Sequence, residues 1–307
     1  MVFQTIASFL VGITGLTGRA AEVANFWIYD TLKISFILFA MVLFIGLIRT
    51  YISPEKIRKY LEGRKSITGY FLAAVLGVVS PFCSCSTIPI FMGFTQAGIP
   101  LGMTLTFLFV SPMVNTAAVV VLLSTLGLSQ AALYITSGII VGVSGGYLLS
   151  RIFGQEDTGA EKSGKGLSET PGMKERWKKA YFEARSIFRD VMPYIVIGVG
   201  IGALIHGLVP ENFIAKYLSG SLAVPGAVLL GVPVYTNIMG VIPVVGSLLG
   251  KGLPIGTGIA FMMSVTALSL PQFFMLKKVM SRKLLITYGL TMSAGIILVG
   301  YIGNILL

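Results

Sequence analysis

Long apolar segments separated by short polar loops are the feature that most restricts how this chain can fold. They cover Phe26–Ile48, Ser66–Ala97, Leu101–Leu123, Gln130–Leu149, Val191–Leu208, Ala223–Leu249, Pro254–Leu276 and Leu284–Leu306. About 20 apolar residues span the core of a bilayer as an α-helix, and within lipid only helices or closed barrels satisfy the backbone hydrogen bonds. The sequence therefore predicts an all-α polytopic membrane protein.

Charge in this sequence is sparse and concentrated in loops. Of the 307 residues, 55% are hydrophobic and 11% are charged, and the mean hydropathy is +0.87, whereas a soluble domain carries about 25% charged residues. The net charge of +11 comes from Lys and Arg between apolar segments, as the positive-inside rule predicts. Since no basic-aromatic motif accompanies them, we expect the lipid bilayer as a partner and no nucleic acid.

The chain divides into two membrane regions, residues 26–150 and 191–307, with one polar segment between them. Residues 1–25 lack a basic start and a small-residue cleavage site, so they predict an interfacial helix or a poorly ordered arm and no signal peptide. In residues 151–190, the Gly- and Ser-rich first part predicts a disordered linker. Residues 173–189 have the amphipathic pattern of a helix on the membrane surface.

The second membrane region repeats the first at a distance of 154 residues. Leu76–Phe107 matches Leu230–Phe261 without a gap, and 9 of the 32 aligned positions are identical. The identical residues of the first region include Gly77, Pro89, Gly98, Pro100 and Gly102. Because chance similarity between apolar segments rarely reproduces the spacing of Gly and Pro, we infer an internal duplication.

Basic loops determine the expected orientation. Residues 49–65 contain six Lys or Arg, residues 151–186 eight and residues 277–283 four, and such loops remain in the cytoplasm. This places the protein in the inner (plasma) membrane with residues 151–190 cytoplasmic. Equivalent segments then cross in opposite directions, and the two interrupted stretches enter from opposite sides, the first from the cytoplasm. The sequence thus predicts two inverted-topology repeats whose proline-broken hairpins meet near the bilayer midplane, where secondary transporters commonly bind substrate.

Both cysteines of the chain, Cys83 and Cys85, lie in the first interrupted stretch between Pro81 and Pro89. Since proline lacks an N–H and clashes with the preceding helical turn, we expect a helix break that lets two thiols one residue apart converge. Thiolates prefer soft ions, and a trivalent arsenic with one organic group has two bonds left for sulfur. The cysteines are therefore candidate metalloid ligands. Neighbours expected at the same site are Phe82, Ser84 and Ser86.

Other interpretations of the cysteines stay open at this stage. Cysteine can be a small apolar residue at a crowded helix contact. A membrane thiol–disulfide electron carrier would also use such a pair, with a thioredoxin-like partner, although the second region has no cysteine and a Cys-x-Cys disulfide closes a strained ring. A permease for a sulfur compound or another small anion is a further alternative.

The equivalent stretch of the second region carries an amide and a thioether in place of the thiols. At the distance of 154 residues, Asn237 stands opposite Cys83 and Met239 opposite Cys85, with Thr236 beside them. A membrane-buried amide requires a reason, so Asn237 is a stronger candidate for substrate contact than Met239, because methionine is usually a core filler.

Polar residues also interrupt the span that follows each stretch. Such groups usually face a cavity or another helix, or hold helices together. The first of these spans adds Asn115 as a candidate substrate contact. Further expected helix breaks are Pro112, Pro243 and Pro271, and the other polar interruptions are Ser111, Thr116, Thr266, Ser269 and Gln272. No acidic residue lies deep in a span, which leaves the coupling mechanism open.

The segment Pro81–Pro89, followed by Gly98-Ile99-Pro100 and by Ser111-Pro112 with Asn115, resembles the predicted-permease family whose named members are the ArsP organoarsenical efflux permeases. The resemblance extends from about Phe26 to Leu306. It implies that the protein is no enzyme and exports small molecules, such as trivalent organoarsenicals, through contact with Cys83 and Cys85. No G-x-x-x-x-G-K-[ST] motif occurs, so we expect a secondary permease without a cofactor and not an ATP-driven pump.

Overall fold

The computed structural model describes residues 2–14, 18–51, 67–80, 84–125, 127–158, 173–208, 222–233, 241, 245–246, 248–250 and 252–306. Helices make up nearly all of these ranges. They contain no β-strand, and one isolated bridge pairs Thr158 with Met280. The prediction of an all-α protein is confirmed for this part of the chain.

The elements in chain order are α1 (Val2–Thr14), α2 (Arg19–Tyr51), α4 (Ile67–Val79), α5 (Ser84–Gln96), α6 (Leu101–Met113), α7 (Thr116–Thr125), α8 (Leu128–Ile152), the 3-10 turn η1 (Gln155–Asp157), α9 (Met173–Leu208), α11 (Ala223–Gly231), α13 (Ile255–Ala267), α14 (Leu270–Leu276) and α15 (Arg282–Leu306).

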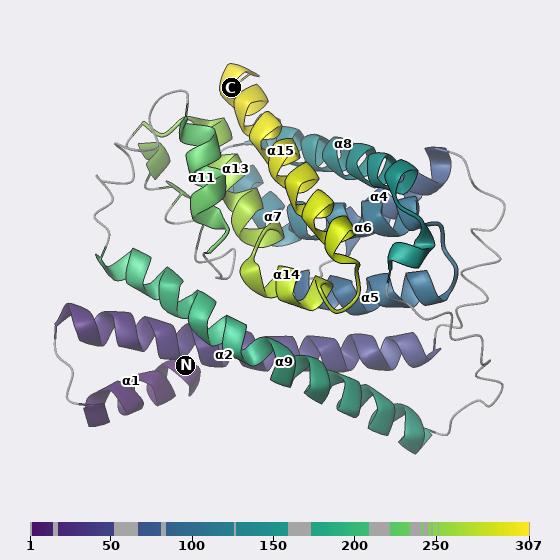
Figure 1. The fold of residues 1–307 in the computed structure, drawn as a ribbon. Coiled ribbons are helices and arrows are strands. Elements are labelled where there is room, and N and C mark those ends of the chain that lie inside the picture. The colour runs from purple at the N-terminus through teal and green to yellow at the C-terminus, as the bar shows by residue number, and fades with distance from the viewer. Residues whose placement is uncertain are drawn as a thin grey trace.

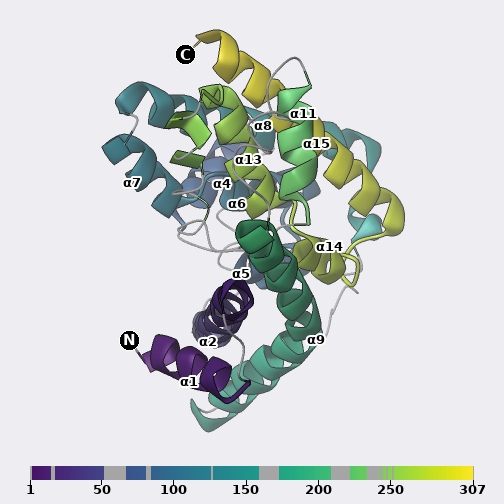
Figure 2. The same cartoon turned by 90° about the vertical axis from the view of Figure 1, so that its left-hand side faces the viewer.

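Helices α2 and α9 form a long pair that lies, with α1, to one side of the other helices (Figures 1 and 2). Trp27 Nε1 near the start of α2 donates to the Val196 carbonyl oxygen at 2.9 Å. Gly46 near its end lies close enough to Ala180 that an added Cβ would be 3.4 Å from the alanine Cβ. The two helices are therefore antiparallel. α2 also packs against α5, and α9 against α14, which joins this pair to the rest of the protein.

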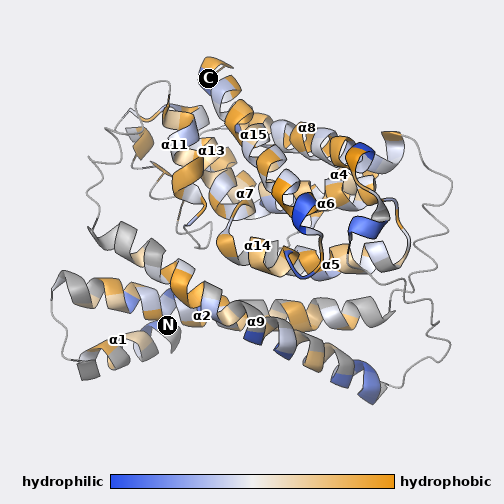
Figure 3. Cartoon of the chain, in the orientation of Figure 1, coloured by the Kyte–Doolittle hydropathy of each residue, from blue (hydrophilic) through white to orange (hydrophobic). Residues whose placement is uncertain are grey.

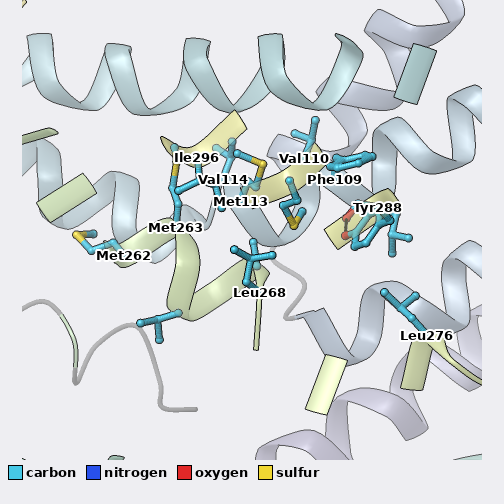
Figure 4. Packing of buried hydrophobic residues seen from close by; sticks show 14 of the residues in the cluster. Phe109, Val110, Met113, Val114, Met262, Met263, Leu268, Leu276, Tyr288 and Ile296 are labelled. Carbon is cyan, nitrogen blue, oxygen red and sulfur yellow. Dashed lines mark hydrogen bonds between the residues drawn. The ribbon is translucent and has the colours of Figure 1, made fainter. Parts of the chain in front are cut away.

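Helices α6 and α13 form the buried centre of the remaining helices. Every residue of α6 is buried, and so is most of α13. α4 and α8 pack on α6, α11 and α15 pack on α13, and the two central helices contact each other. Figure 4 shows Phe109 and Met113 of α6 beside Met263 of α13 and Tyr288 and Ile296 of α15. The core is thus shared by both membrane regions.

Three helices in the described ranges are long and apolar enough to cross a bilayer: Val23–Phe44 within α2, and the whole of α8 and α15. Leu101–Met113 and Ala118–Ser124 would together form a fourth span, bent by 49°. Apolar residues, orange in Figure 3, also cover outward faces of these helices, as at Ile140 and Leu298. Apolar surface of this extent suits lipid and not water, so the chain is a membrane protein.

The helices of the two membrane regions recur at the same distance of 154 residues. α6 and α13 have 13 residues each and start at Leu101 and Ile255, while α8 and α15 have 25 residues each. The turns before α6 and α13 correspond as well. Gly98 and Gly252 have φ values of 77° and 93°, a left-handed conformation that glycine adopts readily.

Helix α9 differs from the sequence prediction because it runs unbroken from Met173 to Leu208. The predicted boundary at residue 190, between a surface helix and a span, is not a helix end. Lys, Arg, Glu and Ala near this boundary are good helix formers, and Pro193 lies inside the helix without ending it. The polar residues gather in the first half, shown in blue in Figure 3.

The first residues of the expected linker are bonded to the second membrane region. Ser281 donates from its backbone nitrogen to the Asp157 carbonyl oxygen at 2.8 Å and from Oγ to Asp157 Oδ1 at 3.2 Å. These bonds join the chain after α8 to the turn before α15, so residues 153–158 are part of the fold. Residues 159–172 lie outside the described ranges. At the N-terminus α1 is helical, one of the two forms expected of that arm.

Candidate functional site

The predicted thiol site lies at the start of α5. This helix begins at Ser84, so Cys85 is in its first turn. Pro81, Phe82 and Cys83 lie outside the described residues, and of Ser84, Cys85 and Ser86 the structure describes the backbone alone. The convergence of the two thiols therefore stays a prediction.

Pro89 does not break α5, which continues through it to Gln96. The prediction of a helix break at Pro89 is therefore wrong. Proline has no amide hydrogen, so the helix lacks the bond that residue 89 would donate to the Cys85 carbonyl, four residues earlier. Two residues before Pro89, Thr87 Oγ1 lies 3.0 Å from Ser111 Oγ. This buried hydroxyl pair fastens α5 to α6.

A break between helices follows α6. Pro112 lies in the last turn of α6, which ends at Met113. Asn115 precedes α7 and is half-buried. Its backbone nitrogen donates to Tyr134 Oη at 3.3 Å, and Tyr134 is fully buried on α8. The structure thus places Asn115 at a break between helices, held by a buried tyrosine. Its contact with substrate stays a prediction.

A second break separates α13 from α14, and Pro271 lies at the start of α14. Gln272 Nε2 donates to Tyr288 Oη at 3.3 Å, and Tyr288 Oη donates to the Leu108 carbonyl oxygen at 3.3 Å. The ring centroids of Tyr288 and Phe109 are 4.5 Å apart, and Figure 4 shows the two side chains next to each other. Tyr288 therefore connects the break in the second region to α6 of the first.

Ser269 and Gln272, at the start of α14, are fully buried. In the described part of the chain, Ser269 Oγ and Gln272 Oε1 have no hydrogen-bond partner. In the sequence, both residues stand out only as polar interruptions of a span. One feature of the sequence could have made Ser269 a candidate site residue: at the distance of 154 residues, it is the equivalent of the candidate Asn115.

The predicted site residues of the second interrupted stretch, Thr236, Asn237, Met239 and Pro243, lie outside the described residues. The neighbours of α5 are described, and α5 packs against α6 and α14. The helix that carries Cys85 thus contacts both the central helix of the first region and the broken helix of the second. Within the described ranges, no group of three His, Cys, Asp or Glu side chains could hold a metal ion.

Comparison with known proteins places the chain in a family. A family model described as "Predicted permease" matches residues 19–305. This chain belongs to the ArsP family of predicted permeases. The family resemblance inferred from the Cys-x-Cys segment is therefore correct, and membership indicates a membrane permease for small molecules.

Relatives of this permease occur in archaea and bacteria. It is 23% identical to UPF0718 protein MJ0584 of Methanocaldococcus jannaschii, over 91% of this chain and 94% of the relative. It is 23% identical to UPF0718 protein YraQ of Escherichia coli, over 78% of this chain and 68% of the relative. It is 37% identical to UPF0718 protein YcgR of Bacillus subtilis over 81 residues, 26% of this chain and 28% of the relative. No solved structure matches the chain.

Proposed function

We propose that this permease is a secondary exporter of a small thiophilic substrate, such as a trivalent organoarsenical, which Cys83 and Cys85 bind. The observation that carries the proposal is the position of Cys85 in the first turn of α5, two residues after Cys83 in the sequence. A helix N-terminus favours negative charge such as that of a thiolate. The missing amide of Pro89 also removes the helical partner of the Cys85 carbonyl, so polar backbone accompanies the thiols.

The two membrane regions are, in this proposal, inverted-topology repeats. The packing of α8 on α15 supports this arrangement, because Gly295 contacts Val141 and Gly303 lies beside Leu133. Residue numbers rise along one helix as they fall along the other, so these equivalent helices are antiparallel. Val141 and Gly295 are themselves 154 residues apart. Equivalent residues meet each other in this way where a twofold axis passes between inverted repeats.

The substrate path follows from these two proposals. The Cys-x-Cys stretch enters from the cytoplasm of the inner membrane, with residues 151–190 on the same side. Thr236, Asn237 and Met239 approach from outside, and Asn115 lines the path beside α6. The contact of α5 with α14 supports a location between the two regions, which is where transporters built from inverted repeats commonly bind substrate.

Uptake of methylarsenite into everted membrane vesicles tests the proposal. We expect Cys83→Ser and Cys85→Ser each to lower uptake about tenfold or more, since the loss of one soft ligand worth about 1.4 kcal/mol changes affinity tenfold. Ser137→Ala is the matched control, because Ser137 Oγ donates only to the Tyr134 carbonyl of its own helix. Undiminished uptake in both cysteine variants would remove the thiols from the mechanism.

The alternative functions give different results in parallel assays. A thiol–disulfide electron carrier would form a mixed disulfide with a thioredoxin-like partner through one cysteine, and Cys→Ser at the other position would trap it. A permease for a sulfur compound or another anion would show competition by that compound against methylarsenite binding to the purified protein. The absence of cysteine from the second region favours export over electron transfer.

A further inference from the structure

Two buried oxygen atoms at the start of α14 have no role in the function proposed above. Ser269 Oγ and Gln272 Oε1 belong to fully buried residues and have no hydrogen-bond partner within the described ranges. Leaving a buried polar atom unpaired costs about 1–3 kcal/mol, so native proteins rarely do so. Two such atoms at the same helix start point to a partner that the described residues do not supply.

The sequence offers both oxygens an internal partner that the structure does not use. Ser-x-x-Gln at a helix start is a capping box, in which Ser Oγ accepts from the Gln N–H and the Gln side chain bonds the Ser N–H. Here the Gln272 N–H donates to the Ser269 carbonyl oxygen at 3.0 Å, and Ser269 makes no side-chain cap bond. Both side-chain oxygens are therefore free to bind a ligand.

The orientation of the Gln272 amide follows from its neighbours. Tyr288 has one hydroxyl hydrogen, and it donates this hydrogen to the Leu108 carbonyl oxygen, which can only accept. Gln272 must therefore present its NH₂ group to Tyr288 Oη. Oε1 then points away from Tyr288, on the opposite edge of the amide group. Because this atom only accepts, its ligand must be a hydrogen-bond donor or a cation.

The end of α13 adds further acceptors to the same break. The Leu268 N–H bonds the Ser264 carbonyl oxygen. No backbone amide of a described residue outside α13 donates to the carbonyls of Val265, Thr266 or Ala267, and Pro271 has no amide hydrogen to offer. The C-terminus of a helix carries a partial negative charge. The break therefore gathers neutral oxygen acceptors at a helix end of partial negative charge.

We infer that the break between α13 and α14 binds a monovalent alkali cation such as Na⁺. Its ligands would include Ser269 Oγ, Gln272 Oε1 and carbonyl oxygens at the end of α13. In membrane transporters, helix C-termini and unwound carbonyls bind Na⁺ in this way, whereas Ca²⁺ and Mg²⁺ sites use carboxylates. None of α5, α6, α13, α14 and α15 contains Asp or Glu, whereas α9, which also packs on α14, does. The site would supply a coupling ion to a permease whose coupling mechanism the sequence leaves open.

Thermal unfolding of the purified full-length protein tests this site without any substrate. A ligand that binds only the folded state stabilises it by RT ln(1 + [L]/Kd). We expect the unfolding midpoint to rise saturably with NaCl, compared with choline chloride at constant ionic strength. Ser269→Ala and Gln272→Met should each raise the apparent Kd for Na⁺ about tenfold, which corresponds to about 1.4 kcal/mol.

Thr104→Val is the matched control, because Thr104 is fully buried on α6, away from the break, and its hydroxyl donates to the Leu101 carbonyl of its own helix. This variant should retain the response to sodium. A wild-type midpoint that is equal in sodium, lithium, potassium and choline overturns the inference, and so does a full response in both site variants. Ordered water would then be the partner of the two oxygens.

Gln272→Glu keeps the length of the side chain and tests the sodium site if Gln272→Met does not fold. The added negative charge should tighten sodium binding and make it weaken at low pH, where protons compete. Sodium affinity unchanged by this variant at every pH would contradict the site. Export of methylarsenite is measured separately, so a cysteine-dependent exporter without a sodium response would disprove this inference alone.

Discussion

Two buried tyrosines at equivalent positions, Tyr134 and Tyr288, hold the two helix breaks by different bonds. Tyr134 Oη accepts from the backbone nitrogen of Asn115, within its own membrane region. Tyr288 Oη accepts from the Gln272 side chain and donates to Leu108, in the other region. The duplicated residues have thus diverged at the level of single bonds. At the second break the tyrosine accepts from a side chain, whereas at the first break it accepts from a backbone nitrogen.

Replacement of Tyr288 by Phe should therefore destabilise the protein. The substitution leaves the Leu108 carbonyl and the Gln272 amide without their partner, and each buried unpaired group costs about 1–3 kcal/mol. Thermal unfolding in sodium-free buffer measures the effect. Tyr147→Phe is the control, because Tyr147 is exposed and bonds only the nearby Arg151, so it should change stability by less than about 0.5 kcal/mol. Equal midpoints for both variants would mean that the bonds of Tyr288 contribute nothing.

Local sequence patterns explain why the acceptor site at Ser269 and Gln272 was not predicted. A Ser-x-x-Gln pattern indicates a capped helix start, which would satisfy both side chains. Tyr288 binds the Gln272 side chain, which then does not make the capping bond. Tyr288 in turn is oriented by the Leu108 carbonyl in the other region. No window of neighbouring residues contains this chain of bonds. Pro89 illustrates the reverse case, because its local signal predicts a break that the packing of α5 against α2 and α6 overrides.

At the scale of elements, the crossing of α8 and α15 depends on a residue difference between the two regions. Val141 of α8 fills the space that the absent side chain of Gly295 leaves on α15, and a Cβ at Gly295 would overlap the valine. Where two equivalent helices meet at equivalent residues, a large and a small side chain fit together, whereas two large ones collide. The divergence of this pair allows the helices to approach closely.

Gly295→Val should therefore destabilise the protein by about 1–3 kcal/mol through overpacking. The double variant Val141→Gly, Gly295→Val exchanges the two side chains and should recover most of the loss, which gives a favourable coupling energy in the double-mutant cycle. Chemical or thermal unfolding in detergent measures each term. Ala294→Val, on the exposed face of the same turn, is the control and should be nearly neutral. A swap that recovers nothing would contradict the direct contact.

At the scale of the whole molecule, the spacing of Gly and Pro residues predicted more of the architecture than the composition of the polar loops did. The distance of 154 residues found from those residues also separates the starts of α6 and α13 and those of α8 and α15, because Gly98 and Gly252 fix the same left-handed turn. The polar segment was less predictable. Helix-forming residues continue α9 past the expected boundary, and a contact distant in sequence, Asp157 with Ser281, holds the first residues of the polar segment in the fold.

The proposed inverted topology predicts which side of the membrane each helix start faces. Leu128 and Arg282 are exposed first residues of the equivalent helices α8 and α15. In an inverted repeat they lie on opposite sides, and the positive-inside rule assigns Arg282 to the cytoplasm. In a background without native cysteines, a membrane-impermeant maleimide should label Leu128→Cys in intact cells, and Arg282→Cys only in everted vesicles. Labelling of both from the same side would mean that the regions are parallel repeats, and the proposed substrate site between them would lose its geometric basis.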